Sequence, residues 1–219
     1  MNHATRMIVS TVGVILGLSG IDHGIFEILQ GNTPTESLII QAIGPDQIMW
    51  KYGGEEAFTI IPNFLLTGIL AILVGIATII WSIWFVRRKH GASVLLLLIV
   101  LLFLLGGGIA APIIFGPLTW AAATRIHKPL SWWQKVLPKR LRGILAKLWP
   151  YTLTIGVISM LIGLYIAITG NIPWSDISDP ERILNICWAF VFGGGWGMFM
   201  LSFVCGFAAD VELNPSEIS

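Results

Sequence analysis

The sequence predicts an all-α protein that crosses a membrane several times, and its composition, its long apolar stretches and its loop charges all indicate this. Of the 219 residues, 55% are hydrophobic and 11% are charged, and the mean hydropathy is +0.82. A soluble globular domain carries about 25% charged residues, so this chain lacks the polar groups to cover a water-exposed surface. The same composition excludes intrinsic disorder and disulfide-scaffold proteins.

Apolar stretches long enough to be membrane segments lie at residues 7–30, 57–86, 93–124, 151–169 and 183–209. A helix needs about 20 apolar residues to cross a hydrocarbon core of about 30 Å. Four of the stretches therefore predict one span each. The first has no small-residue cleavage site, so we expect it to remain in the protein as a helix and not to act as a cleaved signal peptide.

The third apolar stretch predicts two short helices, at about 93–105 and 109–124, joined by a glycine turn. One straight helix over 93–124 is about 48 Å long, which exceeds a single crossing. Gly106–Gly108 lies in its middle, and each glycine in a helix interior costs about 1 kcal/mol. The alternative is one long kinked span.

Loop charge favours the hairpin and predicts the orientation of the chain. Lys and Arg accumulate in short cytoplasmic loops. Basic groups are found at Arg6, at 87–89 and throughout 125–147, whereas 31–56 and 170–182 are net acidic. All the basic groups lie on one side only if 93–124 leaves and returns. We expect six membrane segments in one transmembrane domain, with both termini cytoplasmic, in the plasma or inner membrane.

A basic segment at about 131–149 predicts an amphipathic helix in the headgroup region, broken once at Pro138. Trp and Leu alternating with basic groups are typical of such helices. Its predicted lipid- or partner-binding residues are Trp132, Trp133, Lys135, Lys139, Arg140, Arg142 and Lys147. We expect them to bind anionic headgroups at the cytoplasmic face, and a docked partner protein is the alternative. Nucleic acid is not expected, because the formal net charge is only +1.

The first span contains the predicted functional site. An acid near the middle of a bilayer costs about 2.5–3.5 kcal/mol to insert, yet Asp22, His23 and Glu27 all lie in this span. At 100° per residue they share one sector of the helix with Ser19. We expect His23 and Glu27, one turn apart, to interact directly, unless Glu27 extends outward to the membrane surface.

Beside this polar sector runs a strip of glycines at positions 13, 17, 20 and 24. Glycines at this spacing allow a second helix to approach closely, so the polar groups should lie near a helix contact. Asn63 and Thr67 of the second stretch, and Asn185 of the last, are expected to join them. The glycine strip can serve a contact within the chain, with a second copy or within a larger membrane complex.

Three functions fit this pattern. The first is a small transporter or channel-like protein with an outer-leaflet polar pocket for a proton, cation or small polar ligand, formed by Asp22, His23, Glu27, Ser19 and Asn63. The second is a non-catalytic scaffold or accessory subunit, in which these groups join helices and are fully hydrogen-bonded. The third is an intramembrane metalloenzyme. The sequence indicates no particular cofactor or metal.

Enzyme motifs are mostly missing from the sequence. His23 and Glu27 supply two ligands, whereas zinc takes three or four, and His-Glu-x-x-His does not occur. Glu55-Glu56 resembles the start of the CAAX-type membrane protease motif, but Ile60 stands where that motif has Arg. Ser19 and His23 are similar to a fragment of the ceramidase-type hydrolase motifs, whose His-x-x-x-His helix is absent. We therefore expect binding or transport in preference to catalysis.

Overall fold

The computed structural model describes residues 1–213, which are mostly helical and form two compact units. One unit contains Met1–Ile8, Met49–Gly53 and the chain from Arg125 onward, and the second contains Val9–Ile48 and Gly54–Thr124. Four helical segments in the described chain are long and apolar enough to cross a membrane: His3–Leu29, Phe64–Phe85, Lys139–Thr169 and Pro180–Glu212. The predicted all-α class is confirmed, and the four helical segments are consistent with the predicted membrane spans. The assignment of one transmembrane domain stays a prediction.

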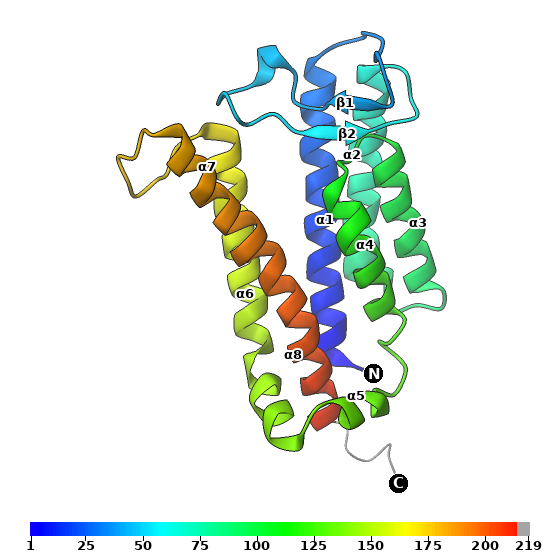
Figure 1. The fold of residues 1–219 in the computed structure, drawn as a ribbon. Helices are drawn as coiled ribbons and strands as arrows, with labels where there is room; N and C mark the ends of the chain where they lie inside the picture. Colours follow the sequence, from blue (N-terminus) through cyan, green and yellow to red (C-terminus); the bar gives the residue numbers. More distant parts are fainter. Residues whose placement is uncertain (214–219) are drawn as a thin grey trace. The chain divides into compact units, whose positions relative to one another are not determined.

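The second unit contains most of α1 together with α2, α3, α4 and a small sheet (Figure 1). The helices are α1 (His3–Leu29), α2 (Phe64–Ile80), α3 (Gly91–Leu104) and α4 (Ala110–Ala123), and a π-helical turn, Trp81–Phe85, extends α2. The strands β1 (Ile39–Gln41) and β2 (Glu56–Phe58) pair antiparallel. This sheet lies in a segment for which the sequence predicts no strand.

Glycines bring α1 and α2 into close contact. A Cβ added at Gly24 would lie 2.6 Å from the carbonyl oxygen of Gly68, and one added at Gly68 would lie 2.6 Å from that of Gly24. Gly17 and Gly75 form a second reciprocal pair of this kind. The predicted helix contact along the glycine strip is confirmed, and the partner at these positions is α2 of the same chain.

The apolar stretch 93–124 forms two helices, α3 and α4, separated by a glycine turn. Gly106 and Gly108 in this turn have φ angles of 92° and 93°, which residues with a Cβ adopt only with strain. Each helix has 14 residues and is about 21 Å long, which is shorter than a hydrocarbon core of about 30 Å. How often this stretch crosses the membrane stays a prediction.

Hydrogen bonds fasten the sheet to the helices of its unit. At the end of α1, the Gln30 amide donates to the carbonyl oxygens of Gln41, at 2.9 Å, and of Ala42, at 2.8 Å. After β2, the Gly106 N–H donates to the carbonyl oxygen of Phe58 at 3.0 Å. The segment between α1 and α2 is therefore held at both α1 and the α3–α4 turn, and these contacts position the residues just before β2.

The first unit contains the remaining helices. They are α5 (Ser131–Val136), α6 (Lys139–Thr169), α7 (Pro180–Trp188) and α8 (Met198–Leu213), with the π-helical segment Ala189–Gly197 joining the last two. Figure 1 shows α6 and α8 side by side. Trp50 packs against the cluster of Ile166, Ile172 and Ile183 at the C-terminal end of α6.

A buried carboxylate caps the N-terminus of α1. Asp210 of α8 is 2% exposed, and its two oxygens accept hydrogen bonds from the N–H groups of Ala4, at 2.9 Å, and Thr5, at 2.8 Å. The Thr5 hydroxyl donates to it as well, at 2.6 Å. The first N–H groups of a helix have no partner within the helix and carry partial positive charge, so this acid stabilises the start of α1.

The basic segment is divided differently from the sequence prediction. Its break does occur at Pro138, between the end of α5 at Val136 and the start of α6 at Lys139. However, 139–149 is not separate from the following span, because α6 runs past Pro150 to Thr169 without interruption. A proline removes only one backbone hydrogen bond, and transmembrane helices tolerate this loss.

Candidate functional site

Polar groups from separate parts of the second unit meet beside the C-terminal half of α1. The helix itself contributes Asp22, His23 and Glu27. Glu55, from the segment just before β2, pairs with His23, and the turn 106–108 packs against His23 and Glu27. Loop, turn and helix thus form one cluster, whose groups are far apart in sequence.

The imidazole of His23 is buried and uses both of its nitrogens. Its Nδ1 lies 2.9 Å from the carbonyl oxygen of Ser19, and because a carbonyl only accepts, Nδ1 carries a hydrogen. Its Nε2 lies 3.1 Å from Oε2 of Glu55. The charge of His23 acts on Glu27, as the helical spacing predicts, but no hydrogen bond joins the two side chains. The imidazole instead pairs with an acid from the loop, 32 positions along the chain.

Glu55 is the solvent-facing member of this pair, with 49% of its side chain exposed. Burial of the remainder raises the pKa of Glu55, but the hydrogen bond and the positive charge of His23 outweigh it and hold the pKa below its ordinary value. Glu55 is therefore a carboxylate at neutral pH and accepts a hydrogen bond from Nε2. The hydrogen on Nε2 of His23 therefore lies between the imidazole and the carboxylate of Glu55.

Glu27 is completely buried, and neither of its carboxylate oxygens has a hydrogen-bond partner among the described residues. The nearby Thr67 hydroxyl donates to the carbonyl oxygen of Leu105 at 2.9 Å. The Thr59 hydroxyl, 2.7 Å from that of Thr67, must then donate to Thr67. Both hydroxyl hydrogens are thus committed elsewhere. The expectation that Glu27 extends outward to the membrane surface is wrong.

The glycine turn between α3 and α4 packs directly on these two side chains. A Cβ at Gly106 would lie 2.6 Å from Oε2 of Glu27 and 2.8 Å from the Thr67 hydroxyl. A Cβ at Gly108 would lie 3.1 Å from Cε1 of His23. Both the positive φ angles and the lack of space require glycine here. The backbone of the turn therefore covers the cluster without placing a side chain over it.

The other predicted site residues lie at the edge of the cluster or outside it. Asp22 is partly exposed, and its carboxylate forms no hydrogen bond within residues 1–213; the charges of His23 and Glu55 act on it. Ser19 contributes its carbonyl oxygen. Asn63 instead caps α2: its side chain accepts from the N–H of Leu66, at 3.1 Å, and no described contact joins it to His23 or Glu27.

The composition of the cluster favours a positively charged ligand. Three carboxylates and one imidazolium, if all are ionised, leave a charge of −3 + 1 = −2. In residues 1–213, no group of three or more His, Cys, Asp or Glu side chains is arranged to hold a metal ion. A hydrolase histidine also needs a nucleophile at the nitrogen opposite its acid, whereas that nitrogen of His23 faces a backbone carbonyl.

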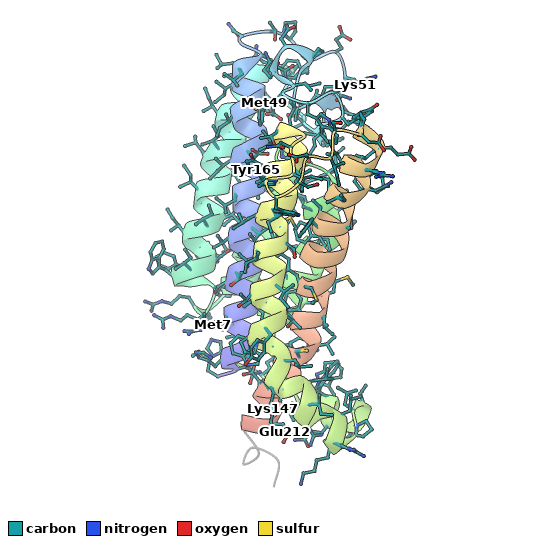
Figure 2. All side chains as sticks on the ribbon, turned by 90° about the vertical axis from the view of Figure 1, so that its left-hand side faces the viewer. Met7, Met49, Lys51, Lys147, Tyr165 and Glu212 are labelled. Atoms are coloured by element: carbon teal, nitrogen blue, oxygen red, sulfur yellow. The ribbon has the colours of Figure 1, made fainter. Side chains whose placement is uncertain are left out.

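The predicted lipid- or partner-binding residues lie on α5 and the first turns of α6. Lys135, Lys139, Arg140 and Lys147 are exposed, whereas Arg142 forms an ion pair with Glu212 of α8. Figure 2 shows Lys147 and Glu212 at one end of α6 and Tyr165 toward the other. The Trp132 and Trp133 rings lie 4.8 Å apart, and both pack edge-on against Phe207.

Sequence reasoning missed Glu55 and the contribution of the turn 106–108 to the site. The acidic charge of 31–56 indicated that this loop could supply a partner for His23, but several acids in it were equivalent by sequence. Comparison of the chain with protein-family models, curated proteins and solved structures found no match. The function is therefore inferred from the geometry of the cluster.

Proposed function

We propose that this protein is a small membrane transporter or channel-like protein that takes up a proton, a cation or a small polar ligand at the cluster of Asp22, His23, Glu27 and Glu55. The buried, unpartnered carboxyl group of Glu27 is the observation that carries this proposal. A buried polar group without a hydrogen bond costs about 1–3 kcal/mol, and more when it is charged. Binding a positive species relieves that cost.

The same observation argues against a purely structural role for the cluster. Side chains that only join helices are expected to be fully hydrogen-bonded. The His23–Glu55 pair meets that expectation, because both imidazole nitrogens have partners. Glu27 does not meet it, although hydroxyl groups lie nearby. We therefore place the scaffold function second and the metalloenzyme third.

The topology that accompanies this function has six membrane segments and both termini in the cytoplasm. Four helical segments have the length to span, and we propose that α3 and α4 form a short hairpin that enters and leaves from the cytoplasmic side. The basic groups of 87–89 and 125–147 then share the cytoplasmic side. The His23–Glu55 pair faces outward, and the plasma or inner membrane is the proposed location.

Flux through liposomes containing the purified protein tests the transport function. We expect wild-type protein to dissipate a gradient of protons, Na⁺ or K⁺, measured one at a time at several pH values, and Glu27→Gln and Asp22→Asn to reduce that flux. Glu56→Gln is the matched control: this adjacent acid accepts a hydrogen bond from Gln41 at 3.2 Å, away from the cluster. Equal flux in wild type, all variants and empty liposomes would refute the transport function.

A second proposal concerns lipid binding by the basic segment. Its exposed basic groups alternate with exposed apolar side chains, including Val136, Leu141 and Ile144, as in helices at a membrane surface. We propose that anionic headgroups bind here, with about 1 kcal/mol per basic residue, and that nucleic acid does not. A partner protein docked on the same surface is the alternative.

Thermal unfolding in detergent tests this lipid contact. We expect phosphatidylglycerol to stabilise the protein more than phosphatidylcholine does, with a difference that decreases at high salt. The double variant Lys139→Gln/Arg140→Gln should lose that difference, and the control Lys51→Gln, outside the segment, should keep it. An unchanged difference in the double variant would contradict the proposal.

A further inference from the structure

We propose that the species bound by this cluster is a proton, that Glu27 holds it inside the protein, and that the His23–Glu55 pair exchanges it with the outer solvent. This inference rests on the proposed function and narrows its substrate to one class. It is carried by the geometry around Glu27 and by the different exposure of the two glutamates.

The acidic and histidine side chains at Glu27 are not arranged for a metal cation: in residues 1–213, no group of three or more His, Cys, Asp or Glu side chains could hold one. Ca²⁺ takes six to eight oxygen ligands, and Mg²⁺ takes six in an octahedron. Here the carboxylate supplies two oxygens, and the neighbouring Thr67 hydroxyl donates to the carbonyl oxygen of Leu105 and accepts from Thr59. The glycine backbone of the turn closes this side without a further side chain. A proton needs one carboxylate oxygen, which is what the site provides.

The groups that can donate that proton are few. The titratable side chains acting at the cluster are His23 and Asp22 on α1 and Glu55 before β2. From α2 there is the Thr67 hydroxyl, and from the α3–α4 turn only backbone. Among the described residues, His23 is thus the one basic group acting on Glu27, and it lies one helical turn away, where side chains on a helix are neighbours.

The exposed fractions of the three side chains indicate the order in which a proton from solvent reaches them. Glu55 is 49% exposed and His23 is nearly buried, whereas Glu27 has no exposed surface. A proton from the outer solvent therefore reaches Glu55 and His23 first. Gly106 and Gly108, two positions apart, lie against Glu27 and His23 respectively, so the backbone of the turn is next to both side chains.

The transfer step is balanced within the cluster. For the transfer, the Nε2–H group of His23 turns from Glu55, its partner in the structure, to Glu27. The N–H bond at Nε2 then breaks, its electron pair stays on the nitrogen, and an O–H bond forms on Glu27. The imidazolium becomes a neutral imidazole that keeps its hydrogen at Nδ1, bonded to the carbonyl oxygen of Ser19. A proton from water, delivered through Glu55, then restores Nε2–H. No oxidant, reductant or metal is required.

Infrared difference spectroscopy of the full-length protein in lipid, titrated with pH, tests the assignment of the proton to Glu27. We expect a carbonyl stretch of a protonated carboxylic acid that disappears on alkalinisation and shifts in D₂O. Glu27→Gln should remove this band, and Glu56→Gln should leave it unchanged. His23→Gln should keep the band but slow its exchange with D₂O by about 100-fold, the lower range for loss of a general acid. A pH-dependent band that survives in Glu27→Gln, or its absence from the wild type, overturns the inference.

Flux measurements on the same samples separate this inference from the transport function. Glu27-dependent Na⁺ or K⁺ flux without the carboxylic acid band supports transport and overturns the proton assignment. A Glu27-dependent band without flux of any ion supports proton binding and overturns transport. Glu27→Gln preserves side-chain volume, and its unfolding temperature in detergent establishes that it is folded. If that variant does not fold, Glu27→Asp replaces it: the proton inference then expects the band to shift in frequency, and an unshifted band overturns it.

Discussion

Replacing Gly106 with alanine tests whether the α3–α4 turn lies directly on Glu27. Two costs are expected. The first is the φ angle of 92°, which costs a residue with a Cβ about 1–2 kcal/mol. The second is contact, because the new Cβ would lie 2.6 Å from Oε2 of Glu27 and 2.8 Å from the Thr67 hydroxyl. Overpacking of this kind costs about 1–3 kcal/mol.

Gly31→Ala is the matched control, because it shares the first cost and lacks the second. Gly31 has a φ angle of 79°, and a Cβ there meets nothing within 4 Å. We therefore expect Gly106→Ala to lower the free energy of unfolding by about 1–3 kcal/mol more than Gly31→Ala does. Denaturant titration in detergent micelles, followed by Trp fluorescence, measures both values. Equal destabilisation by the two variants would refute the packing of the turn on Glu27.

Three further predictions concern the contacts that hold the second unit and α1 in place. Gly24→Ala should destabilise the protein by about 1–3 kcal/mol in thermal unfolding, because its Cβ meets the carbonyl oxygen of Gly68. The control Gly143→Ala, with open space around the new Cβ, should be neutral or stabilising by up to about 1 kcal/mol. Because folding lowers the pKa of Glu55 from its ordinary value of 4.5, the ionised side chain stabilises the fold above pH 4.5, and this stability is lost as the pH falls through the lowered pKa. Glu55→Gln should remove this loss from the pH profile of the free energy of unfolding. A profile unchanged from wild type would contradict the ion pair. Asp210→Ala should cost about 1.5–3 kcal/mol, since a charged acceptor for the first N–H groups of α1 is removed; hydrogen exchange at Ala4 and Thr5 that matches the wild type would show that the cap is absent.

The polar sector of α1 and its glycine strip could be predicted because both depend on local geometry. A helix places residues three and four positions apart on one face, so Asp22, His23 and Glu27 were expected together. The spacing of Gly17 and Gly24 predicted a close helix partner. The identity of that partner, α2 with Gly68 and Gly75, required the folded chain.

The partners of the polar side chains could not be predicted from spacing. His23 and Glu27 are one turn apart, so a direct interaction was expected, but the hydrogen-bond partner of the imidazole is Glu55 from the loop. Which acid of that loop does so depends on the pairing of β1 with β2 and on the hydrogen bond between Gly106 and Phe58. These contacts join residues far apart in the sequence, and the composition of the loop does not predict which of its acids makes them.

The sequence alone predicted apolar helices long enough to span a membrane and placed the unusual ionisable groups on the first of them, because composition and helical periodicity are properties of neighbouring residues. Tertiary structure decided which of these groups is paired and which is not. It placed Glu55 on His23 and left the carboxyl group of Glu27 buried beneath the turn 106–108 without a donor. Hydrogen bonding of buried groups depends on which distant segments meet, and folding alone brings those segments together.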